Sequence, residues 1–198
     1  MTRYAALIVF LVGVVGWGAI RLPHEVKNKR KNRIDISRVD RQERVLLIIS
    51  LAGLGILPIA YALLRGRGFL AFADYGFFPL QAWLGTLVFA AALALFLATH
   101  RQLGRNWSQT LELREGHTLV THGVYRLVRH PMYSAFFLWG LAQALLLQNW
   151  IVGPAGLIGF GTLYAFRVGR EEAMMRTAFG ASYADYEART KRVIPFIH

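Results

Sequence analysis

Long runs without charged residues alternate with short, strongly basic segments along this chain of 198 residues. The uncharged runs are Tyr4–Ile20, Val45–Leu64, Tyr75–Thr99 and Pro131–Phe166. A membrane-spanning helix needs roughly 20 apolar residues, with a working range of about 17–25. The first three runs therefore each predict one spanning helix.

The fourth run, with thirty-six residues, is too long for a single spanning helix. Gln148, Asn149, Gly153 and Pro154 supply turn chemistry inside it, so we predict two short helices in a tight hairpin. Because Ile151–Phe166 is short for a full span, we expect the hairpin to tilt or to thin the bilayer. The pattern thus predicts an all-α integral membrane protein with about five transmembrane helices, the last two forming a helical hairpin.

The segment after the fifth predicted helix repeats apolar residues at steps of three and four. These residues are Met174, Met175, Phe179, Tyr183 and Tyr186. The spacing predicts a C-terminal cytosolic amphipathic helix, which Gly180 interrupts as a helix C-cap. We expect two parts: residues 1–99, with three transmembrane helices and a basic cytosolic loop at 21–44, and residues 100–198, with a loop, the hairpin and the cytosolic helices.

The positive charge is distributed unevenly between the two predicted sides of the membrane. With the N-terminus outside, the inner segments 21–44, 100–130 and 167–198 hold twenty Lys and Arg residues, against three in the outer segments. This is the positive-inside pattern of membrane proteins. It explains the net charge of +12 without nucleic acid, and it predicts contact between the basic segments and anionic membrane lipids.

Composition narrows the chemistry further. The chain has no cysteine, which excludes disulfides, thiolate metal sites and cysteine nucleophiles. Its six histidines show neither HxxxH nor HExxH spacing, so we predict no metal site. The richness in Ala, Gly and Arg is typical of a GC-rich bacterial genome, so we expect a bacterial inner membrane with the site on its cytosolic face.

The segment "HTLVTHGVYRLVRHPMY" at 117–133 carries more chemistry than a simple anchor requires. Pro131 suits the first turn of the fourth helix, which places His130 near the N-cap and predicts a helix start able to receive an anion such as a carboxylate. Tyr125 and Tyr133 supply aromatic faces for a flat base or a sulfonium. The alternative is an interfacial belt of Tyr, His and Arg anchors, and this segment alone does not decide between the two.

A second group, "FRVGREE", follows the fifth helix and holds Arg167, Glu171 and Glu172. Arg167 and Glu171 lie four residues apart on one helical face, a spacing that an exposed ion pair would also explain. The predicted hairpin returns this group to the membrane face of His130 and Tyr133. We therefore expect both groups to meet in one site at the inner leaflet.

These motifs resemble the isoprenylcysteine carboxyl methyltransferase family and its bacterial relatives. The ordered features are "HTLVTHGVYRLVRHPMY", a helical hairpin, "RxxxEE" and the tail "FGASYADYEARTKRVIP". They cover roughly residues 104–197, and the first three helices match only in character. The resemblance implies an integral-membrane methyltransferase that uses S-adenosyl-L-methionine and has no Rossmann domain.

The resemblance also implies roles for individual residues. Arg167 matches the residue that the family uses for its substrate, and Arg167, Glu171 and Glu172 are the catalytic candidates. An upstream polar cofactor contact of the eukaryotic enzymes has no clear counterpart, with Gln109 and Thr110 as candidates. The implied cofactor contacts are His117, Thr118, Leu119, Val120, Tyr125, His130, Pro131, Met132, Tyr133 and Glu171.

Three functions stay open at this point. The first is O-methylation of the carboxylate of an isoprenylcysteine-like or other lipophilic acid, which Arg167 would hold. The second is N-methylation of an amino phospholipid such as phosphatidylethanolamine, with Glu171, Glu172 or His130 as the base. The third is a non-catalytic membrane protein that binds a lipid or a partner. The sequence gives no oligomeric state.

Overall fold

The computed structural model describes residues 1–31, 34–37, 40–64, 68, 70–104, 112–114, 116 and 118–195. For residues 27–31, 34–37 and 112–114 the backbone alone is described. The α-helices are α1 (Arg3–Lys31), α2 (Arg41–Leu51), α3 (Leu57–Leu63), α4 (Pro79–Leu103), α5 (Pro131–Leu146), α6 (Val152–Phe179) and α7 (Ala181–Arg189). The π-helix η1 (Ala52–Ile56) joins α2 to α3, and the 3-10 turns η2 (Ala71–Ala73) and η4 (Gly123–Arg126) lie in connections.

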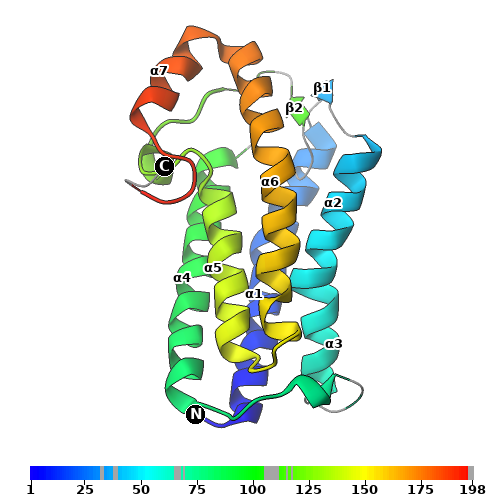
Figure 1. The fold of residues 1–198 in the computed structure, drawn as a ribbon. Coiled ribbons are helices and arrows are strands. Elements are labelled where there is room, and N and C mark those ends of the chain that lie inside the picture. The colour runs from blue at the N-terminus through cyan, green and yellow to red at the C-terminus, as the bar shows by residue number, and fades with distance from the viewer. Residues whose placement is uncertain are drawn as a thin grey trace.

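The helices α1 to α6 form one bundle, and α7 lies at one end of it (Figure 1). α4 packs along α1 and α5, and α6 packs between α5 and α2. α1, the continuous α2–η1–α3 rod and α4 are each long and apolar enough to cross a membrane, and α5 is a shorter apolar helix. These helices confirm the predicted all-α membrane fold, and α5 with α6 forms the predicted hairpin.

The hairpin turn lies where the polar residues of the fourth apolar run predicted it. α5 ends at Leu146 and α6 begins at Val152. Asn149 Oδ1 accepts hydrogen bonds from the backbone N–H groups of Ile151 at 2.9 Å and Val152 at 2.8 Å. An asparagine that accepts these hydrogen bonds supplies partners for backbone N–H groups that the start of a helix leaves unpaired.

Residues 21–44 differ from the predicted loop. α1 continues past the end of its apolar run to Lys31, and α2 begins at Arg41. Between them, β1 (Ile34–Ser37) pairs antiparallel with β2 (Glu112–Arg114), with Ser37 opposite Glu112. The basic residues after Ile20 are good helix formers, so α1 carries on beyond the apolar stretch.

α6 is also longer than the apolar pattern predicted, because it extends through the charged residues to Phe179. Gly180 then adopts a φ of +52° and separates α6 from α7, as its predicted C-cap role requires. The amphipathic segment is therefore split: its first half is the end of α6, and its second half is α7.

A tight contact fixes η1 against the hairpin. A Cβ atom added to Gly53 would lie 2.3 Å from the backbone oxygen of Ala155. Gln143 Nε2 from α5 donates to the carbonyl oxygens of Gly53 at 3.0 Å and Val152 at 2.7 Å. Glycine is therefore needed at position 53, and Gln143 joins α5, α6 and η1 close to the hairpin turn.

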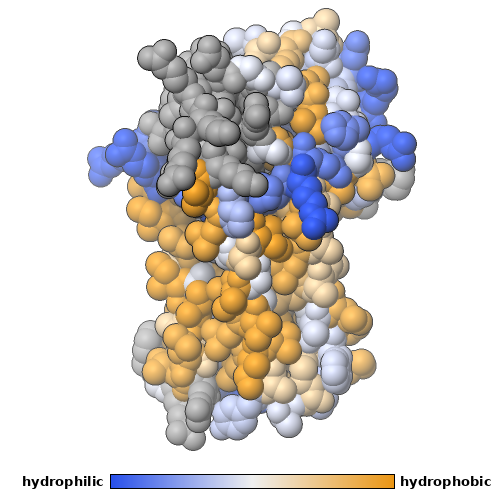
Figure 2. Space-filling view, turned by 180° about the vertical axis from the view of Figure 1, so that it is seen from behind, coloured by the Kyte–Doolittle hydropathy of each residue, from blue (hydrophilic) through white to orange (hydrophobic). Residues whose placement is uncertain are grey.

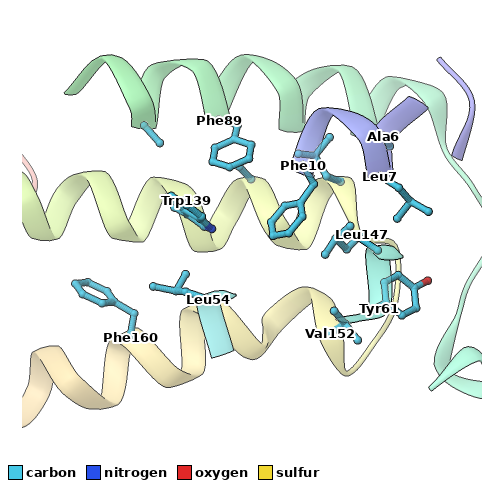
Figure 3. Close-up of a cluster of buried hydrophobic side chains, with 14 of the residues drawn as sticks. Ala6, Leu7, Phe10, Leu54, Tyr61, Phe89, Trp139, Leu147, Val152 and Phe160 are labelled. Carbon is cyan, nitrogen blue, oxygen red and sulfur yellow. The ribbon is translucent and has the colours of Figure 1, made fainter. Parts of the chain in front are cut away.

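The core and the surface agree with a membrane environment. Aromatic rings fill the space between α1, α4 and α5, where Phe89 lies 5.8 Å from Phe10 and 5.0 Å from Trp139 between ring centroids (Figure 3). Hydrophobic side chains form a broad band along the bundle, and hydrophilic ones gather near the end that carries α7 (Figure 2). The apolar band is the surface that a bilayer would cover.

Candidate functional site

The start of α5 is held by the C-terminal segment. Pro131 is the first helical residue and His130 is the N-cap, as the sequence predicted. The backbone N–H of Arg129 donates to the carbonyl of Lys191 at 2.7 Å, and that of His130 donates to Arg192 at 2.8 Å. Residues of the same chain therefore occupy these two N–H groups, which precede the helix. That the first turn of α5 receives a carboxylate stays a prediction.

Glu171 on α6 faces the first turn of α5. The Tyr133 hydroxyl donates a short hydrogen bond to Glu171 Oε2. His130 Nδ1 lies 3.8 Å from Glu171 Oε1, and Arg167 Nε lies 3.9 Å from Glu171 Oε2. The two groups of residues that the sequence singled out thus meet side by side in their described parts, 118–133 and 166–172.

Glu172 points elsewhere, into a buried cluster of positive charge. Its carboxylate is fully buried and lies 2.8 Å from Arg129 Nη2, 2.8 Å from Arg192 Nη2 and 3.3 Å from His130 Nε2. Burial alone would raise the pKa of Glu172, but hydrogen bonds from His130, Arg192 and Arg129 outweigh it and lower the pKa far below its ordinary value. Glu172 therefore ties the start of α5 to the C-terminal segment as a carboxylate.

Arg167 has a buried partner that the sequence analysis missed. Arg167 Nη1 lies 3.0 Å from Glu43 Oε1, and Glu43 is fully buried in the first turn of α2. The Asp40 side chain caps this helix by accepting from the Glu43 backbone N–H at 2.8 Å. The Asp-x-x-Glu spacing before an apolar run is a helix-start signal that could have drawn attention to Glu43.

A cavity of about 400 Å³ lies between these groups. Glu171 and Arg167 line it together with most of the predicted cofactor contacts: Thr118, Leu119, Val120, Tyr125, His130, Met132 and Tyr133. Pro131 and Glu172 do not line it. His117, Gln109 and Thr110 lie outside the described residues.

Tyrosines from η4 and α7 close the polar part of the cavity. Tyr125, Tyr183 and Tyr186 line it, and the Tyr186 hydroxyl donates to the carbonyl oxygen of Tyr125 at 2.6 Å. Burial raises the pKa of Tyr125 well above its ordinary value. The phenol is therefore neutral at physiological pH and presents an aromatic face to the cavity. The sequence analysis had assigned Tyr183 and Tyr186 only to an amphipathic helix.

The other end of the cavity is apolar and runs down the bundle. Leu54 from η1, Trp139 from α5 and Phe160 from α6 project toward the space between their helices (Figure 3). The lining on the α2–η1–α3 rod extends from Leu47 to Ile59, which is about 18 Å of helix. One cavity thus joins a polar, charged end to a long hydrocarbon-like end.

This geometry can be compared with known proteins. Residues 83–177 match the profile of the Isoprenylcysteine carboxyl methyltransferase (ICMT) family. This segment is therefore similar to the ICMT family. These residues include α5, most of α6 and the pair of Arg167 and Glu171, so the matched segment supplies more than half of the residues that line the cavity.

Curated relatives and a solved structure with the same family name are also similar to this chain. The chain is 31% identical to protein-S-isoprenylcysteine O-methyltransferase of Dictyostelium discoideum, over 59% of this chain and 50% of the relative. It is 34% identical to protein-S-isoprenylcysteine O-methyltransferase B of Arabidopsis thaliana, over 48% of this chain and 49% of the relative. The chain thus spans about half the length of these curated relatives.

The structural comparison extends beyond the matched segment. The fold resembles that of the eukaryotic intramembrane Ras methyltransferase ICMT with a TM-score of 0.53 and 26% identity. The similarity covers 81% of this chain and 55% of that chain. Helices before residue 83 therefore take part in the structural likeness, although the family profile does not include them.

Proposed function

We propose that this chain is an integral-membrane methyltransferase that uses S-adenosyl-L-methionine to O-methylate the carboxylate of an isoprenylcysteine-like or other lipophilic acid. The observation that carries the proposal is the composition of the cavity. Arg167 and Glu171 lie at its polar end, and apolar side chains from five helices continue it into the bundle. An acceptor with a charged head and a hydrocarbon tail fits such a cavity.

The residues at the polar end suit the cofactor. The Glu171 carboxylate, whose side chain is 29% exposed, is available to a positively charged group. Tyr125, Tyr183 and Tyr186 provide aromatic faces, which attract cations such as a sulfonium. Residues 118–120, with His130, Met132 and Tyr133, complete this end. When bound, the cofactor supplies an activated methyl group.

The residues of the chain then have to hold and orient the acceptor. A carboxylate is ionised at neutral pH, so it needs no general base before it accepts a methyl group. Arg167 lines the cavity and is only 7% exposed, so its charge acts where little water competes. Glu171 contacts both Tyr133 and Arg167, and it therefore orients the guanidinium beside the cofactor residues. In-line placement is the main catalytic contribution of such a site.

The apolar end provides the binding energy for the tail. Each buried methylene group contributes roughly 0.8 kcal/mol, so a prenyl or acyl chain between Leu54, Trp139 and Phe160 would hold the acceptor firmly. The tail would enter from the bilayer and the cofactor from the cytosol. We place the chain in a bacterial inner membrane with its N-terminus outside, and its basic segments 21–44, 100–130 and 167–198 against anionic lipids.

N-methylation of phosphatidylethanolamine is the second candidate. It requires a base that removes a proton from the ammonium head group. Glu171 and His130 line the cavity and could serve, whereas Glu172 is buried behind it and bound by Arg129 and Arg192. The negative charge of Glu43 and Glu171 on either side of Arg167 is the observation that favours a cationic acceptor.

Calorimetry of cofactor binding first distinguishes a methyltransferase from a non-catalytic membrane protein. In detergent, the wild type is expected to bind S-adenosyl-L-methionine, and Glu171→Ala to bind it about tenfold more weakly, which corresponds to about 1.4 kcal/mol. Asp185→Asn, an exposed change on α7, is the control and should bind like the wild type. A folded wild type with no measurable binding would contradict the proposal and leave a non-catalytic lipid- or partner-binding protein.

The acceptor is tested with cofactor carrying a labelled methyl group. Purified protein receives a prenylcysteine analogue in one reaction and phosphatidylethanolamine in another. We expect label in the prenylcysteine product. Label in the phospholipid alone would replace the proposed acceptor with an amino lipid.

A further inference from the structure

A buried carboxylate outside the family-matched segment contacts the proposed substrate residue. Glu43 is fully buried, although charged side chains are almost never fully buried unless they are paired. Its position is fixed by α2, which begins at Arg41 with Asp40 as its N-cap. The helix therefore fixes the backbone of Glu43, and its carboxylate lies in the interior against α6.

The partner of Glu43 is Arg167, from a helix that lies far away in the sequence. The distance of 3.0 Å from Arg167 Nη1 to Glu43 Oε1 defines an ion pair, although neither Glu43 oxygen accepts a well-aligned hydrogen bond from the described residues. The attraction between the charges thus holds the pair. Because little water reaches either group, this attraction is strong, and the loss of one charge would leave the other buried alone.

The same rod that carries Glu43 also forms a wall of the apolar cavity. Leu47, Leu51 and Leu54 follow Glu43 along α2 and η1, and all three line the cavity. Gly53 and Gly159 hold this rod against α6 at backbone distance, since a Cβ on Gly159 would lie 2.8 Å from the Ile49 carbonyl oxygen. The wall that would touch the acceptor tail and the pair at Arg167 are therefore parts of one rigid unit.

Arg167 is positioned from two sides. Glu43 lies at its Nη1 atom and Glu171 lies 3.9 Å from its Nε atom. Glu171 belongs to the same helix as Arg167 and also to the group that would bind the cofactor, so it cannot relate the guanidinium to the tail cavity. Glu43 can, because it comes from the wall of that cavity.

We infer that Glu43 is a positioning residue that holds Arg167 in register with the apolar wall formed by α2 and η1. The inference rests on the proposed function, because it assigns Glu43 a task only if Arg167 binds the acceptor head group. Glu43 acts through Arg167 and does not itself line the cavity. By holding Arg167, Glu43 would fix the distance between the bound head group and the bound tail of the acceptor. That distance decides whether the acceptor carboxylate reaches the methyl group of the cofactor.

The test uses Glu43→Gln, which keeps the shape of the side chain and removes its charge. A displaced guanidinium would lower kcat/KM for the prenylcysteine analogue by about tenfold to a hundredfold. Cofactor affinity by calorimetry should stay unchanged, because Glu171 and Tyr133 remain. Glu43→Asp keeps the charge and should restore part of the lost activity. A Glu43→Gln protein with unchanged kcat/KM would overturn the inference.

The matched control is Asp40→Asn. Asp40 also joins α2 to α6, through an ion pair of 2.8 Å with Arg170, but it does not contact Arg167. Asparagine keeps the helix cap, so the variant removes one inter-helix charge pair without unwinding α2. Activity of Asp40→Asn should equal that of the wild type. An equal loss in Asp40→Asn and Glu43→Gln would overturn the inference, because it would reflect general loosening of α2.

A second measurement separates failure of the inference from failure of the proposed function. Thermal unfolding is compared for Glu43→Gln, Arg167→Gln and the double variant. If the two charges stabilise each other, the double variant loses less stability than the two single losses together. Additive losses would overturn the inference even if no acceptor is found. A wild type that transfers no methyl group, with non-additive losses, would overturn the proposed function and leave the pair intact.

Discussion

Tyr133 donates its hydroxyl hydrogen to Glu171, and this bond joins the first turn of α5 to the part of α6 that lies beyond the apolar run. Neither residue lies near the other in sequence, and the hairpin of α5 and α6 brings them together. The bond fixes the direction of the Glu171 carboxylate at the cavity wall. Loss of this bond is therefore expected to weaken the binding of the proposed cofactor.

Tyr133→Phe should weaken the binding of S-adenosyl-L-methionine by about tenfold, because hydrogen bonds to charged groups contribute about 1.5–3 kcal/mol. Calorimetry in detergent measures the change. Tyr164→Phe is the matched control, since the Tyr164 ring packs 5.6 Å from that of Tyr133 and its hydroxyl has no hydrogen bond among the described contacts. Equal affinity in the wild type and Tyr133→Phe would show that the bond does not organise the cofactor site.

Arg167→Lys should retain cofactor binding and lose about a hundredfold or more in methyl transfer to the prenylcysteine analogue. Lysine keeps the charge but lacks the planar fork that holds a carboxylate in one orientation. The two quantities are measured on the same preparation, with binding by calorimetry and transfer by a labelled methyl group. Wild-type turnover in this variant would exclude Arg167 from the acceptor site.

Gly55→Leu should weaken the binding of an acceptor with a long tail. Gly55 lines the cavity, and a Cβ added there would meet only Leu51 Cδ1, at 3.4 Å, so a larger side chain would extend into the cavity. Loss of contact with two methylene groups corresponds to about a tenfold higher KM for the prenylated analogue. Gly161→Leu is the control, because a Cβ there meets nothing within 4 Å and Gly161 does not line the cavity. Equal KM values in both variants would contradict the assignment of the tail.

Glu172→Gln tests the charge cluster behind the cavity. The variant leaves Arg129 and Arg192 without their shared carboxylate, and the loss of stability at neutral pH should be about 3 kcal/mol. The pKa of Glu172 is lower in the folded protein than in the unfolded chain. Its contribution is therefore fully present above the unfolded value of about 4.3 and is lost as the pH falls below it.

Thermal unfolding across pH checks both statements about Glu172. The difference in melting temperature between the wild type and Glu172→Gln should be constant from neutral pH to about pH 5 and should narrow below about pH 4. Glu187→Gln is the comparison variant. Glu187 pairs with the half-exposed Arg176 at 2.6 Å and lies farther, at 3.6 Å, from Arg129 Nη2, so its loss should cost less than about 1 kcal/mol. A difference that widens toward acid would contradict the direction of the pKa shift.

The fold could be predicted largely from the runs of uncharged residues. These runs located the membrane helices and the hairpin turn at Asn149, because apolar length and turn chemistry act locally. The continuation of α1 to Lys31 and of α6 to Phe179 was not predicted. Charged residues with good helix propensity extend a helix beyond its apolar part, and hydropathy carries no signal for this extension.

The meeting of the two candidate groups was predictable because the hairpin brings their residues together. His130, Tyr133, Arg167 and Glu171 were predicted to lie close to one another, and the structure places them side by side. Glu43 was not, because its pairing with Arg167 depends on how α2 packs against α6, which only the three-dimensional structure gives. Glu171 and Glu172 point in different directions because adjacent residues lie on different faces of α6. The sequence did not define which neighbour each of these faces would meet.

The most direct test of the central claim is the identity of the product that carries the labelled methyl group. Purified protein and labelled S-adenosyl-L-methionine are incubated with a total extract of membrane lipids and small acids, and the labelled product is treated with alkali. A methyl ester on a lipophilic acid releases its label as volatile methanol, and this is the result we predict. Label that stays on an alkali-stable N-methyl group of a phospholipid head group, or no label at all with folded protein, would contradict the account.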